Sequence, residues 1–149
     1  MGYTHYWRRP QDLDMEKFKA AVEDCKVVCD KLSIPLGDWD GKGEPVFTYT
    51  EIALNGKGDD DSCETFHVPQ HIESSQYQEP NEQGRYIDFC KTNYRPYDIV
   101  VQCCLLVFQH HFPDDEFVIS SDGGESEWKD AHDMCESTLG YEHKKEAAT

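Results

Sequence analysis

Residues 85–112, RYIDFCKTNYRPYDIVVQCCLLVFQHHF, decide how this chain folds. The first six residues alternate between two sets, Arg85-Ile87-Phe89 and Tyr86-Asp88-Cys90, which predicts a strand buried mainly on one face. From residue 99 to residue 108, only Gln102 is plainly polar, so we predict a helix that is buried on nearly all sides. A run of about 15 residues is too short to cross a membrane, which takes roughly 20. This helix is therefore expected to form the centre of the core.

A polar turn joins this strand to this helix. Pro96 is favoured at the first helical position, and the first N–H groups of a helix have no partners within it. Such a place binds anions through its backbone donors, and Lys91, Thr92 and Arg95 add two positive charges and a hydroxyl group. The sequence thus predicts an anion-binding corner. In the alternative interpretation, Lys91 and Arg95 pair with Asp88, Asp98 or Asp122 and only fix the turn.

The rest of the chain supplies strands and helices that can cover the central helix. We expect strands over residues 2–7, 46–54, 62–68, 85–90 and 117–120, and helices over 12–32, 96–111 and 126–139. The order β-α-β-β-β-α-β-α is typical of an α+β fold, with one mixed sheet of about five strands and three helices packed on it. The length of 149 residues favours a single domain over residues 1–141, followed by a frayed tail over 142–149.

A second polar corner follows the last expected strand. Ser121 and Asp122 stand there before the last helix, and the corner meets the first one if the two strands run parallel. The N-terminal strand can then add Tyr3 and His5 to the same site. His5 is a candidate acid–base group because the ordinary pKa of histidine lies near neutrality, and the alternative is a packed structural histidine.

The composition limits the kinds of partner that this chain is expected to bind. Lys and Arg total 14 against 30 Asp and Glu, a net charge of −16, which argues against a general nucleic-acid binder. Seven cysteines and a start without an apolar leader predict a cytoplasmic protein with free thiols. The spacing Cys63-x3-His67-x3-His71 resembles a metal motif, but four residues of strand span about 13 Å, so we expect no metal and no cofactor.

Several motifs carry a resemblance to a family of small proteins found in bacteria and in their phages. They begin with residues 2–7, GYTHYW, and continue in the segments ETF (64–66), VP (68–69), QEPNE (78–82), CKT (90–92), RPYD (95–98), FV (117–118), SDG (121–123) and LGY (139–141). Trp128, Asp130-Ala131 and Cys135 belong to the same pattern, and around residues 56–61 the chain is shorter than that pattern. The resemblance implies a phage or prophage accessory protein and implies no activity.

These observations lead to one expected function and two alternatives. We expect a binding protein that occupies a host protein or sequesters a small phosphate-bearing ligand, in a counter-defence or host-takeover role in the host cytoplasm. The first alternative is an enzyme that acts on a nucleotide or phosphoester and uses His5, Lys91 and Asp122. The second is an interaction domain without a pocket.

Overall fold

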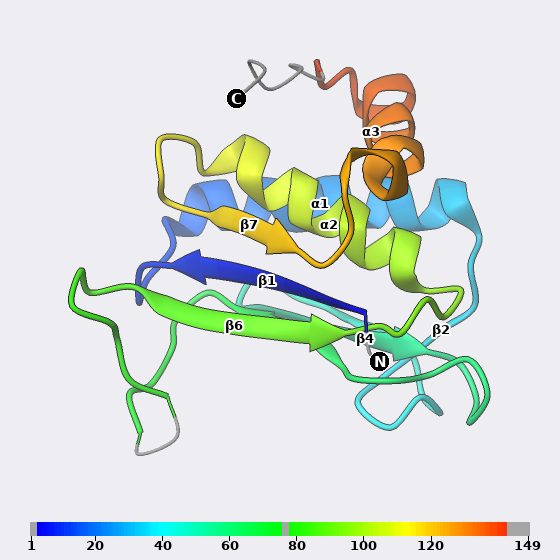
Figure 1. Cartoon of the computed structure of the whole chain (residues 1–149), viewed down its shortest axis with the longest axis horizontal. Helices are drawn as coiled ribbons and strands as arrows, with labels where there is room; N and C mark the ends of the chain where they lie inside the picture. The colour runs from blue at the N-terminus through cyan, green and yellow to red at the C-terminus, as the bar shows by residue number, and fades with distance from the viewer. Residues whose placement is uncertain (1–2, 76–77, 143–149) are drawn as a thin grey trace.

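The computed structural model describes residues 3–75 and 78–142 and confirms an α+β fold (Figure 1). Three helices and seven strands are present among the described residues. In chain order they are β1 (Thr4–Arg9), α1 (Met15–Leu32), β2 (Leu36–Gly37), β3 (Val46–Phe47), β4 (Glu51–Gly56), β5 (Phe66–Pro69), β6 (Tyr86–Lys91), α2 (Asp98–His111), β7 (Val118–Ser121) and α3 (Glu125–Leu139). All three helices and the strands flanking α2 lie where the periodicity predicts them, whereas the expected tail lies mostly outside the described residues.

The strands form two sheets, so the expectation of one mixed sheet is wrong. The first sheet has the order β6-β1-β7, and β1 runs antiparallel to both neighbours. The strands β6 and β7 therefore run parallel to each other and end at the same edge. The second sheet has the order β2-β4-β3, with β5 also paired to β4.

The second sheet departs from prediction because a tight turn divides the strand expected over 46–54. Thr48 donates its N–H to the carbonyl of Glu51, and its hydroxyl oxygen accepts the N–H groups of Thr50 and Glu51. Hydroxyl side chains that bond to the nearby backbone favour turns over strands. The chain therefore reverses between β3 and β4, which pair antiparallel. The short strand β2 lies in a segment expected to be a loop.

The helix α2 is the centre of the core, as predicted. Val100, Val101, Cys104 and Leu105 are fully buried in it, and α1 and α3 both pack against it. Figure 1 shows the three helices gathered on one side of the β6-β1-β7 sheet. All seven cysteines are free thiols, and most are buried. Among the described residues, no helix is both long and apolar enough to cross a membrane.

The first turn of α2 differs from the prediction. The helix begins at Asp98, and Pro96 stands in the turn before it. Asn93 and Tyr94 both have positive φ, 52° and 62°, and the N–H of Arg95 then bonds to the carbonyl of Thr92. A second turn follows, in which the N–H of Asp98 bonds to the carbonyl of Arg95. Two successive turns thus place the helix start two residues later than expected.

Candidate functional site

The ends of β6 and β7 meet at the start of β1, which brings the two predicted corners together. The N–H of Thr92 donates to the carbonyl of Tyr3, and the N–H of Asp122 donates to the carbonyl of Thr4. The N–H of Thr4 in turn donates to the Asp122 carboxylate at 3.0 Å. Segments far apart in the sequence are therefore fixed at one edge of the sheet.

A buried histidine joins these segments through its ring nitrogens. His5 is fully buried, its Nε2 lies 2.7 Å from Oδ1 of Asp98, and its Nδ1 lies 2.7 Å from Oγ of Ser121. The hydroxyl of Thr92, also fully buried, donates to the same oxygen of Asp98. Alternation explains the placement, because His5 points to the helix side of the sheet and reaches the start of α2.

A carboxylate, an imidazole and a hydroxyl group linked in series can transfer a proton. Here each of the three groups is bonded to other groups of the protein. Ser121 Oγ also accepts the N–H of Gly123 at 2.9 Å, so the hydroxyl braces the turn before α3. Among the described residues, every buried side-chain polar atom has a hydrogen-bond partner. The arrangement therefore ties β1, α2 and β7 together, as a packed structural histidine would.

The trio required by the enzyme alternative is not assembled. In the pairing of β1 with β6, His5 lies opposite Cys90, whereas Lys91 lies opposite Thr4. Successive side chains of a strand point to opposite faces, so Lys91 is on the outer side of the sheet and His5 on the helix side. The Asp122 carboxylate is held by the backbone of β1.

Tyr3 and Tyr94 form an aromatic pair at this edge. Their ring centroids lie 4.0 Å apart with an interplanar angle of 18°. Tyr3 is 2 % exposed, whereas Tyr94 is 69 % exposed and leaves much of its surface open to solvent. Burial, assisted by the Asp98 carboxylate, raises the pKa of Tyr3 to about 12, so its hydroxyl stays protonated at neutral pH.

The two cations of the predicted corner, Lys91 and Arg95, are available to bind an anion. Lys91 is half-buried and Arg95 exposed, and neither side chain makes an ion pair or hydrogen bond within residues 3–75 and 78–142. The three aspartates that the alternative interpretation assigns to them have other partners, and the first of them, Asp88, accepts the N–H of Phe89. Asp98 bonds to His5 and Thr92, and Asp122 bonds to Thr4. The structure thus brings Tyr3, His5, Thr92, Ser121 and Asp122 together in one hydrogen-bonded network, which we call the brace and which also includes Asp98. Lys91 and Arg95 lie outside the brace.

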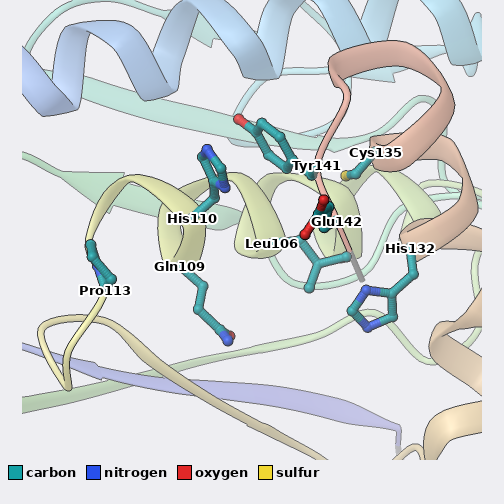
Figure 2. A pocket seen from close by; sticks show the side chains of 8 residues that line it. All are labelled: Leu106, Gln109, His110, Pro113, His132, Cys135, Tyr141 and Glu142. Atoms are coloured by element: carbon teal, nitrogen blue, oxygen red, sulfur yellow. The ribbon is translucent and has the colours of Figure 1, made fainter. Parts of the chain in front are cut away.

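Sequence reasoning missed a cavity of about 320 Å³ between the second half of α2 and α3 (Figure 2). Its lining residues are Leu106, Gln109, His110, Pro113, His132, Cys135, Tyr141 and Glu142. The His110 and Tyr141 rings stack with centroids 3.7 Å apart. Partial burial and the neighbouring His111 lower the pKa of His110 below its ordinary value. No spacing in the sequence marks these residues, because they converge from two helices, the turn after α2 and the segment after α3.

No group of three or more metal-ligating side chains comes together in the part of the chain that the structure describes. The histidines of the Cys63-His67-His71 motif turn to separate partners. His67 Nε2 lies 3.0 Å from the Glu51 carboxylate, and His71 Nδ1 lies 2.6 Å from the Asp12 carboxylate. Each histidine therefore forms its own local ion pair when protonated.

Comparison with protein-family models, with curated proteins and with solved structures finds no match for this chain.

Proposed function

We propose that this chain is a binding protein that holds a phosphate-bearing ligand at the exposed side of the corner, with Lys91 and Arg95 as the gripping residues. One observation carries the proposal: neither cation has a side-chain partner among the described residues, whereas Asp98 and Asp122 of the same corner are both bonded to other groups. An arginine fork matches the geometry of phosphate oxygens through two parallel bonds.

The brace behind the corner supports this role by fixing its shape. Thr92, whose hydroxyl the sequence places among the ligand groups, is buried and donates to Asp98, so it positions the turn instead of touching a ligand. Tyr94, held against Tyr3, adds an exposed ring beside Arg95. The family resemblance supports a phage or prophage accessory role, in which such a protein sequesters a host ligand as counter-defence or host takeover.

The test is a thermal shift measured with inorganic phosphate and with a panel of nucleotides. Wild-type protein is expected to be stabilised, because a ligand that binds only the folded state raises the melting temperature. Arg95→Lys should weaken binding even though it keeps the charge. Arg95→Ala should weaken it about tenfold or more, since a hydrogen bond to a charged group contributes roughly 1.5–3 kcal/mol.

The matched control is Lys26→Ala, which removes an exposed cation from α1 and should leave binding unchanged. Arg95→Ala should also leave the melting temperature without ligand unchanged, because Arg95 has no side-chain partner among the described residues. If none of these anions stabilises the wild-type protein, the ligand-binding proposal fails.

A second candidate function follows from the exposed surface of α3. Glu125, Glu127, Asp130, Asp133 and Glu136 are all exposed there, and the single cation of the helix, Lys129, is already paired with Asp133 at 2.7 Å. Such a surface can occupy a basic, nucleic-acid-binding host protein through electrostatic attraction. Capture of a host protein whose yield falls steeply with salt is expected, and a yield independent of salt would contradict this candidate.

A further inference from the structure

The β6-β1-β7 sheet has an outer face that none of the described helices covers. His5, Trp7 and Arg9 of β1 are buried on the helix side, so the alternate positions point outward. These positions, defined here as the outer sheet face, are Thr4, Tyr6 and Arg8 of β1, Ile87, Phe89 and Lys91 of β6, and Val118 and Ser120 of β7. Figure 1 shows the helices on the other side of this sheet.

Exposed apolar side chains lie at the middle of this face. Ile87 is 57 % exposed and Phe89 is 55 % exposed. Tyr6 lies directly opposite Phe89 on the neighbouring strand, and their ring centroids are 6.4 Å apart. Two adjacent strands thus present one aromatic ring each, side by side on an open sheet.

The charge of this face differs in sign from that of the chain. The chain has 30 carboxylates, yet none stands at the eight positions of the outer sheet face, which include two cations. Arg8 pairs with the exposed Asp115 at 3.2 Å, and the Lys91 side chain has no ion-pair partner in residues 3–75 and 78–142. Arg85 directly precedes β6 and continues its alternation on the same side.

We propose that the outer sheet face binds a single strand of RNA, with bases stacked on Tyr6 and Phe89 and phosphates near Lys91 and Arg85. Open antiparallel sheets that carry exposed aromatics recognise unpaired bases in this way, and cations beside them hold the backbone. Thr4 and Ser120 place hydroxyl groups on the same face as Tyr6, Ser120 directly opposite it, where they can bond to the 2′-hydroxyl of RNA.

Charge decides between RNA and a second copy of this chain. In a symmetric dimer the face would meet itself and offer no carboxylate to its own cations, because none of its eight positions is acidic. The net charge of −16 still opposes long nucleic acids, but charges beyond about 10 Å are screened at 0.1 M salt, so a short strand on this face is the expected ligand. The proposal shares Lys91 with the proposed function and rests on Tyr6 and Phe89, so the two can fail separately.

The test measures the fluorescence anisotropy of a labelled oligoadenylate RNA of about 12 nucleotides, a length within the usual site sizes of such proteins. Phe89→Ala should weaken binding by roughly five- to 150-fold, the range expected for the loss of one stacked base. Lys91→Ala should reduce the slope of log K against log salt by about 0.7. The control is Tyr49→Ala, which removes an aromatic ring of similar exposure, 52 %, between β3 and β4 and should change nothing.

Three outcomes would overturn the proposal. These outcomes are no RNA binding by the wild-type protein at low salt, equal binding by Phe89→Ala, or equal affinity for the matching DNA strand. A wild-type dimer that Phe89→Ala converts to a monomer, without RNA binding, would assign the face to a second copy. Because Phe89 is more than half exposed, the variant should fold, and circular dichroism checks this. Loss of phosphate binding in Arg95→Ala, with RNA binding by the same variant intact, would separate the two sites.

Discussion

At the scale of single residues, buried polar groups specify the corner. His5, Thr92 and Asp98 satisfy one another, and neither His5 nor Thr92 is exposed to solvent. A buried group left without its partner costs about 1–3 kcal/mol, so these bonds favour one arrangement of β1 against α2. These hydrogen bonds therefore make the corner rigid before any ligand binds.

The prediction at this scale concerns Thr92→Val, which keeps the shape of the side chain and removes its hydroxyl. The Asp98 carboxylate then loses a donor, and we expect the free energy of unfolding to fall by about 1–3 kcal/mol. Urea denaturation measures it. Thr138→Val, at a half-buried position on α3, is the control and should cost less. An unchanged stability of Thr92→Val would show that the hydroxyl is not part of the brace.

At the scale of elements, the approach of α3 to β1 depends on a glycine. A Cβ atom at Gly123 would lie 2.2 Å from the hydroxyl oxygen of Tyr3 and within 3.0 Å of its ring. That ring is buried and stacked on Tyr94, so it has little room to move. The turn after β7 can therefore pass Tyr3 only without a side chain, and this sets where α3 begins.

We predict that Gly123→Ala lowers the free energy of unfolding by about 1–3 kcal/mol, the usual cost of adding a methyl group to a packed site. Gly124→Ala is the matched control. A Cβ there meets nothing closer than 3.5 Å, so the cost should stay below about 1 kcal/mol despite the cap position. Urea denaturation of both variants measures the two free energies of unfolding. Equal values would mean that the Tyr3 ring moves aside at no cost in stability.

At the scale of the whole molecule, the net charge of −16 acts against the compact state. Exposed carboxylates repel one another over distances that salt screens. Three Lys or Arg side chains form ion pairs among the described residues, all with partly or largely exposed partners, and such surface pairs contribute little. The fold therefore depends on its core to overcome self-repulsion.

We expect the melting temperature to rise by several degrees between about 10 mM and 200 mM sodium chloride, because the screening length falls from about 30 Å to below 10 Å. Asp60→Asn, at an exposed loop position, should raise the melting temperature at low salt and have no effect at high salt. Calorimetry at both salt concentrations measures these shifts. A melting temperature independent of salt would mean that the self-repulsion is already balanced.

The sequence by itself determined the three helices and the strands β1, β6 and β7, because their periodicity is a local property of neighbouring residues. It left open whether the two corners meet, because that depends on both strands running antiparallel to β1, which only the strand pairing in the structure shows. The division of the strand over 46–54 was missed because Thr48 bonds to the backbone of its own turn and overrides a good strand pattern.

Only the tertiary structure decided what the individual polar residues do. Nothing near Arg9 in the sequence shows that it is fully buried and donates to the carbonyls of Pro10, Gln11, Pro69 and Gln70, with its pKa lowered by burial to about 10. His5 meets an aspartate 93 residues away, and the cavity beside Tyr141 is assembled in the same manner. Such contacts depend on how the elements pack against one another, and local sequence patterns carry no information about partners so distant along the chain.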